Sequence, residues 1–121
     1  MNYTEIKSVL SQIHDPAMRL EFVMDLGLEI PPIPANHAGT EIHGCASRVE
    51  IYRDENNNYY GSADSAIVRG VLSLLLSMVQ GKGPNEIQKM NLMREFESLN
   101  LSLGAGRMTG ITGIIGFLEG L

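Results

Sequence analysis

The chain has 121 residues, of which 44% are hydrophobic and 19% are charged, and its formal net charge is −5. This length suits one hydrophobic core, so we expect a single domain over residues 1–121. An acidic chain without clustered Lys and Arg is a poor binder of phosphate backbones, which argues against nucleic acid as a partner. The first ten residues show no signal-peptide pattern, and the apolar run at 71–79 is too short to cross a bilayer. We therefore expect a cytoplasmic protein that does not bind membranes.

Two amphipathic helices are predicted at the start of the chain. Residues 3–13 and 16–28 both carry apolar side chains at helical spacing. Asp15 before Pro16 is a typical helix start, because Asp can cap the helix and the proline ring already has a helical φ. The prolines that follow predict an irregular connection over residues 29–39.

From residue 41 the period of apolar residues changes to two. Val49 and Ile51 alternate with polar neighbours, and a cluster of turn-forming residues at 54–58 precedes Tyr59. This pattern predicts a β-hairpin, with residues 40–43 as a candidate third strand.

The next predicted helix, over residues 65–79, is apolar on nearly every side, with Asp64 or Ser62 as its cap. A helix that is hydrophobic all round belongs at the centre of a core. Shorter helical segments are expected at 84–90 and 93–99.

The last predicted helix, over residues 105–118, carries glycines at 110, 113 and 116. This spacing predicts a stripe without side chains that another element can approach closely. The order of elements favours an α+β domain in which an antiparallel sheet of about three strands is covered by helices.

Cys45 is the only cysteine, so it cannot form a disulfide within the chain. A free cysteine is often an inert buried residue, but this one follows Gly44, which leaves room for a partner's sulfur. His43 and Arg48 could favour the reactive thiolate. If the strand of Val49 extended backwards, Cys45 would face the core side. Both interpretations, an inert and a reactive thiol, remain open from the residues alone.

Three other chemistries have weaker support in the sequence. His43 and Cys45 are zinc-ligand types, with His14 and His37 as further candidates, but paired spacing is absent. The glycines at 104–110 lack the preceding strand of a dinucleotide-binding loop. Asp64 and Ser65 are more simply explained as a helix cap than as an acid and a nucleophile.

Three segments together resemble the SufE family, which includes the CsdE proteins. Residues 42–49 read Ile-His-Gly-Cys-Ala-Ser-Arg-Val and are similar to the family's Gly-Cys-x-Ser-x-Val run. Residues 61–70 are similar to its Asp-x-x-Ile-Val-Lys/Arg-Gly helix entry, and Arg107 matches a basic residue before the last helix. Two positions differ: Ala46 replaces a common glutamine and Glu50 replaces a common tryptophan.

The resemblance implies a sulfur carrier with a SufE/IscU-like fold. Cys45 would accept persulfide sulfur from a cysteine desulfurase and deliver it to an iron-sulfur cluster scaffold. The chain would then be an accessory protein that stimulates the desulfurase, with no cofactor or metal of its own, because pyridoxal phosphate belongs to the partner. We expect a monomer or weak dimer. The residues expected to shape the loop or contact the partner are His43, Gly44, Ser47, Arg48, Asp64 and Arg107.

The carrier hypothesis also predicts that Cys45 is sheltered, near Val49 and Ile51 or beneath the loop before the last helix, until a partner binds, with Gly44 letting the loop swing outward. A sheltered thiol avoids overoxidation. Two alternatives stay open: an interaction module with an inert cysteine, and a small metal-binding protein.

Overall fold

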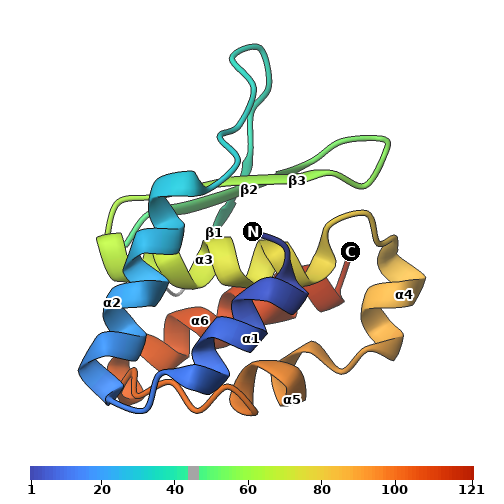
Figure 1. Cartoon of the computed structure of the whole chain (residues 1–121). Helices are drawn as coiled ribbons and strands as arrows, with labels where there is room; N and C mark the ends of the chain where they lie inside the picture. Colours follow the sequence, from blue (N-terminus) through green and yellow to red (C-terminus); the bar gives the residue numbers. More distant parts are fainter. Residues whose placement is uncertain (44–46) are drawn as a thin grey trace.

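The computed structural model of the chain describes residues 1–43 and 47–121. Its sheet lies on one side of the molecule and the helices lie on the other (Figure 1). No helix in these described ranges is both long and apolar enough to span a bilayer. In chain order the elements are α1 (Tyr3–Gln12), α2 (Pro16–Leu26), the 3-10 helix η1 (Gly27–Glu29), β1 (Thr40–Ile42), β2 (Val49–Arg53), β3 (Tyr59–Ala63), α3 (Ala66–Val79), α4 (Pro84–Lys89), α5 (Leu92–Glu97) and α6 (Ala105–Glu119).

The sheet is antiparallel in the order β1-β2-β3, which confirms the predicted hairpin and its third strand. Ile42 pairs with Val49 at the start of β2, and Val49 pairs with Ala63 at the end of β3. Val49 is fully buried and Ile51 is 2% exposed, because this face of the sheet packs against α3. The prediction of an α+β fold with a small antiparallel sheet is therefore confirmed.

The outer edge of β3 is covered by groups from three other segments. The Gln80 side chain accepts from the Tyr59 N–H at 2.9 Å and donates to the Tyr59 carbonyl at 2.6 Å. The Gly61 N–H donates to the Pro31 carbonyl at 2.9 Å. The Arg69 guanidinium donates to the Ala63 carbonyl at 3.0 Å. These bonds take the place of a fourth strand.

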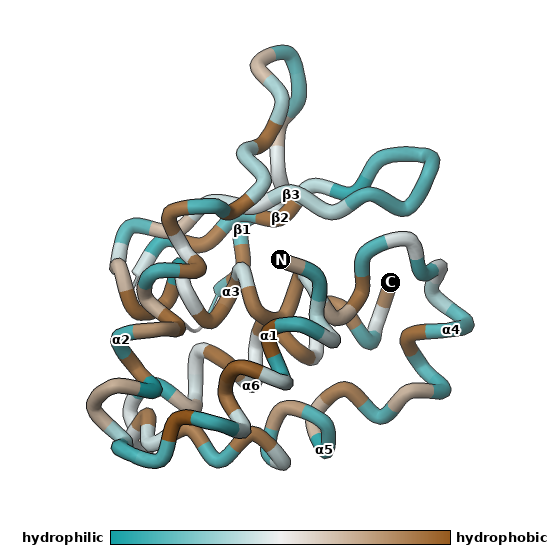
Figure 2. Tube along the Cα trace, viewed as in Figure 1, coloured by the Kyte–Doolittle hydropathy of each residue, from teal (hydrophilic) through white to brown (hydrophobic). Residues whose placement is uncertain are grey.

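Helix α3 is the centre of the core, as its hydrophobicity predicted. Its leucines at positions 72, 74, 75 and 76 are all fully buried, and it packs against α1, α2, β3 and α6. Figure 2 shows apolar colour distributed along the helices and mainly hydrophilic colour on the loop between β2 and β3.

The cap of α3 differs from the prediction. Ser65 is the cap, and its hydroxyl accepts from the Val68 N–H at 3.4 Å. Asp64 is engaged elsewhere, because its N–H donates to the Arg48 carbonyl at 3.2 Å and so extends the β2-β3 pairing by one residue. Ser62 lies within β3, so neither predicted residue is free to begin the helix.

Close contact between backbones occurs where α2 crosses α3. A Cβ placed on Gly70 would lie 2.2 Å from the Val23 carbonyl oxygen, so only glycine fits there without a shift of α2. The predicted glycine stripe of α6 has a neighbour at Gly113, whose added Cβ would lie 3.3 Å from the His43 carbonyl oxygen. Gly116 faces open space, so the prediction of close approach was wrong at that position.

The N-terminal helices begin as predicted. Asp15 caps α2 by accepting from the Ala17 N–H at 2.8 Å. The α-helix ends at Leu26, two residues before the predicted end, and η1 follows it. The Arg19 guanidinium donates to carbonyls of Leu10 and Leu99, and so ties α2 to the end of α1 and to the segment after α5.

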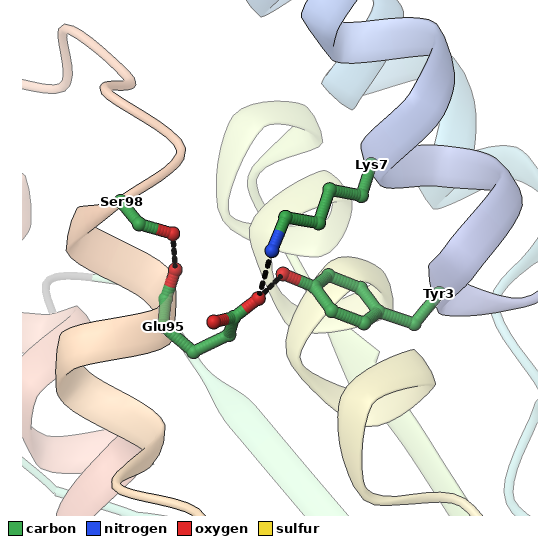
Figure 3. Close-up of polar contacts among 4 residues, drawn as sticks. All are labelled: Tyr3, Lys7, Glu95 and Ser98. Carbon is green, nitrogen blue, oxygen red and sulfur yellow. Dashed lines mark hydrogen bonds and ion pairs between the residues drawn. The ribbon is translucent and has the colours of Figure 1, made fainter.

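A polar cluster also joins α1 to α5. The Glu95 carboxylate accepts from the Tyr3 hydroxyl at 2.5 Å and from the Lys7 ammonium at 2.8 Å (Figure 3). The Lys7 and Tyr3 hydrogen bonds lower the pKa of Glu95. Burial and the Glu95 hydrogen bond raise the pKa of Tyr3.

Candidate functional site at the first turns of α3 and α6

A small cavity of about 140 Å³ adjoins the segment that connects β1 to β2. Ser47 contributes from that segment, Ser65 and Val68 from the start of α3, and Arg107 from the first turn of α6. Three residues of α6 complete the lining: Gly106, Gly110 and Ile111. The cavity therefore forms where two helices begin beside the β1-β2 connection.

The electrostatics of this cavity favour an anion. Both α3 and α6 present their N-terminal turns to it, and helix N-termini carry partial positive charge. The Arg107 side chain adds a full positive charge and has no ion-pair partner among the described residues. Gly104 precedes α6 with φ of +77°, a conformation that favours glycine, and so sets the direction in which this helix starts.

The far end of the connection is held by pairing between Arg48 and Asp64. The Arg48 N–H donates to the Asp64 carboxylate at 3.4 Å, and the Asp64 N–H donates to the Arg48 carbonyl at 3.2 Å. The Arg48 guanidinium forms an ion pair with Glu50 at 2.7 Å. Arg48 therefore has a carboxylate partner on the adjoining strand, whereas Arg107 is the cation that lines the cavity.

The near end of the connection rests on α6. His43 follows β1 and is exposed, as expected for a histidine that faces solvent. Its carbonyl lies over Gly113, where a side chain would crowd it. The two ends of the connection are thus fixed by α6 on one side and by the end of β3 on the other.

Gly44 and Cys45 lie outside the described residues, and so does the expectation that Cys45 packs near Val49 and Ile51. Of the other predicted residues, Ser47 and Arg107 share one cavity, and Arg48 and Asp64 are hydrogen-bonded to each other. No group of three or more His, Cys, Asp or Glu side chains suited to a metal ion occurs within residues 1–43 and 47–121.

Sequence reasoning missed the hydrophobic part of the cavity lining. The sequence places Val68 in the all-round apolar helix, gives no role to Ile111, and explains Ser65 as part of a helix cap. The spacing of Ser65 and Val68 could have predicted that they line the same site, because residues three apart share a face in the first turn of α3.

Comparison with known proteins agrees with this arrangement. The SufE family, described as an Fe-S metabolism associated domain, matches residues 4–119. The sulfur acceptor protein CsdE of Escherichia coli is 31% identical over 97 residues, which span 74% of this chain and 66% of CsdE. An uncharacterised SufE-like protein of Synechocystis is 27% identical over 124 residues, spanning 98% of this chain and 78% of that protein.

A solved structure supports the fold. The solution structure of a hypothetical protein from Thermus thermophilus superimposes with a TM-score of 0.70 at 14% identity, covering 98% of this chain and 90% of that one. The family match covers nearly the whole chain, and the sheet-and-helix arrangement agrees with it. The chain therefore belongs to the SufE family of domains associated with iron-sulfur metabolism.

Proposed function

We propose that this protein accepts sulfur on Cys45 from the persulfide of a cysteine desulfurase, stimulates that enzyme, and passes the sulfur to an iron-sulfur cluster scaffold. One observation supports the proposal: the only cysteine of the chain belongs by sequence to the β1-β2 connection, and Ser47 of that connection lines a cavity together with Arg107 and the first turns of two helices. Membership of a family associated with Fe-S metabolism supports it, as does similarity to a protein named as a sulfur acceptor.

The chemical step is a thiol exchange. The Cys45 thiolate attacks the terminal sulfur of the desulfurase persulfide, and a new sulfur-sulfur bond forms on Cys45. The original sulfur-sulfur bond breaks, and the desulfurase cysteine leaves as a thiolate. No external oxidant or reductant is required, because one persulfide is lost and one is formed. Delivery repeats the same exchange with a thiolate of the recipient.

Positive potential around the cavity would assist this exchange. Thiolates and persulfide anions are stabilised by nearby cations and by helix N-termini. Arg107 and the first turns of α3 and α6 supply both kinds of positive charge close to the chain segment that carries Cys45. The same groups would hold the sulfur in its reactive, deprotonated form.

The test is mass spectrometry of the intact protein after incubation with a cysteine desulfurase and cysteine. Wild-type protein is expected to gain one or more sulfur atoms that a thiol reductant removes, and to raise the rate of desulfurase turnover. Cys45→Ser should gain none, because it removes the only thiol. A reducible sulfur adduct on Cys45→Ser would contradict the proposal.

A second measurement separates this function from an inert cysteine. Cys45 should react with an alkylating agent while the protein stays folded, because the loop that shelters the thiol can open without global unfolding. Ser8→Ala serves as the control, since it changes an exposed serine of α1 outside the cavity lining without removing the thiol. Alkylation that requires unfolding would instead identify an inert buried residue.

A further inference from the structure

The exposed large apolar side chains of the described residues gather at the N-terminal end of the chain. Leu28 is 79% exposed, Met1 and Met18 are each 57% exposed, and Met24 is 41% exposed. Single exposed apolar residues are ordinary on protein surfaces. Here, however, three of the four lie on α2 or η1, and Met1 and Leu28 border the same hollow.

Two adjoining cavities lie at this place. One, of about 170 Å³, is lined by Ile6 of α1, Leu26 of α2 and Leu76 of α3. The other, of about 310 Å³, is lined by Phe22 and Leu28. Met1, Leu26 and Glu29 line both cavities, so the two are neighbours. An apolar cavity of about 150 Å³ holds benzene, so this hollow can receive an aliphatic or aromatic side chain.

The charged side chains that line this hollow are carboxylates, and Met1, which also lines it, carries the α-ammonium. Asp25 lines the larger cavity and Glu29 lines both, and neither has an ion-pair partner among the described residues. Glu21 is also exposed on α2. A second copy of the chain would bring these carboxylates against each other, and anionic lipids or nucleic acids would be repelled. A positively charged protein segment has the complementary charge.

We propose that this α2 surface, made of Met1, Phe22, Asp25, Leu28 and Glu29, is a docking site for a basic amphipathic segment of a partner protein. One apolar side chain of that segment enters the hollow, and flanking Lys or Arg residues pair with Asp25 and Glu29. Methionine side chains are flexible enough to repack around different anchors. Buried apolar anchors with charged neighbours are the usual source of affinity in such interfaces.

The α2 surface and the cavity lined by Ser47 and Arg107 are distinct sites. Val68 of α3 lines that cavity, and the nearest residue of the same helix that lines the hollow is Ser73. These residues are five positions apart, which is about 7.5 Å along a helix axis. The two sites share no lining residue among those that the structure describes. The proposal does not depend on whether Cys45 carries sulfur.

The test uses a synthetic helical peptide with Leu and Lys at positions i and i+4, titrated into isotopically labelled protein. In NMR spectra, the chemical shifts of the amides of residues 18–29 are expected to change until the protein is saturated with peptide. A peptide with Ser in place of Leu, and one with Glu in place of Lys, should each bind at least about tenfold more weakly.

Variants of the protein locate the site. Leu28→Ser, and Asp25→Asn combined with Glu29→Gln, should each weaken binding by about tenfold. Glu97→Gln is the matched control, because it removes one exposed carboxylate from another helix. The four residues changed in these three variants lie on the surface. The midpoint of thermal unfolding of each variant verifies that it remains folded.

Several outcomes would overturn the proposal. These are the absence of saturable binding, shift changes centred on residues 43–48 or 106–111, and an equal loss of binding in Glu97→Gln. A wild-type dimer that Leu28→Ser dissociates would show that a second copy occupies the surface. Failure of any of these tests leaves the sulfur-acceptor proposal intact, since Cys45→Ser tests that separately.

Discussion

Arg107 is identified both by the sequence resemblance and by its position in the candidate site. It lines the cavity beside the β1-β2 connection, and its side chain is exposed without an ion-pair partner among the described residues. An exposed, unpaired charge contributes little to folding. We propose that Arg107 attracts a negatively charged group, with the sulfur of Cys45 as the candidate.

We predict that Arg107→Ala slows formation of the Cys45 persulfide by roughly tenfold while the free energy of unfolding changes by less than about 0.5 kcal/mol. Single-turnover kinetics with a desulfurase and urea denaturation measure the two effects. Arg107→Lys should recover much of the rate, because the charge is kept. Arg94→Ala, which removes an exposed arginine from α5, is the control. Equal rates in Arg107→Ala and Arg94→Ala would show that Arg107 has no part in transfer.

At the scale of elements, the crossing of α2 and α3 depends on a glycine. A Cβ on Gly70 would lie 2.2 Å from the Val23 carbonyl oxygen and 2.7 Å from the Val23 carbonyl carbon. Both atoms belong to the backbone, so the helices must move apart. We predict that Gly70→Ala destabilises the protein by about 1–3 kcal/mol, as expected when a packed core is overfilled.

The matched control for this prediction is Gly116→Ala in α6. Its added Cβ meets nothing within 4 Å, so the helical preference of alanine should stabilise the protein by up to about 1 kcal/mol. Urea denaturation of both variants gives the comparison. If Gly70→Ala and Gly116→Ala changed the free energy of unfolding by similar amounts and with the same sign, helix propensity, not the crossing, would determine the effect at Gly70.

These elements also show what sequence patterns can predict. The alternation at Val49 and Ile51 and the all-round hydrophobicity of α3 located the sheet and the core helix, because burial imposes those periods directly. Glycine spacing on α6 did not locate the close backbone contact at Gly70, where α2 crosses α3. A glycine pattern within one helix contains no information about which other helix crosses it.

Only some residues of the candidate site could be predicted from the sequence. Ser47 and Arg107 were identified through resemblance, and the structure places them in one cavity. Val68 and Ile111 were missed, because an apolar residue at the rim of a cavity has the same helical spacing as one in the core. The acidic, apolar α2 surface was also missed, since Leu28 belongs to the apolar spacing that predicts a buried helix face.

For the molecule as a whole, the cluster of Tyr3, Lys7 and Glu95 makes stability depend on pH. Hydrogen bonds from Lys7 and Tyr3 lower the pKa of Glu95 in the folded state. This stabilisation is present above the ordinary pKa of 4.5 and is lost as the pH falls through the lowered value. Burial and Glu95 raise the pKa of Tyr3, so stability should also fall as the pH rises above the ordinary value of 10.0.

We predict that Glu95→Gln flattens the acid side of the stability profile. Glu95 is at the surface, so the difference from wild type should be within about 0.2–1 kcal/mol at neutral pH and should vanish on acidification. Urea denaturation between about pH 7 and pH 3 measures it. Glu97→Gln in the same helix is the control. A wild-type profile parallel to that of Glu95→Gln throughout would rule out a role for this cluster.

The covered edge of β3 has a consequence for how the molecule opens. Tyr59 and Gly61 lie at the outer boundary of the sheet, yet their N–H groups donate to Gln80 and Pro31. Amide hydrogens of an edge strand normally exchange with solvent through small local fluctuations. Here each exchange event requires Gln80 or the Pro31 segment to detach first. We therefore expect these two amides to exchange as slowly as those in the interior of the sheet, and faster exchange in Gln80→Ala at Tyr59 alone would trace the protection to that side chain.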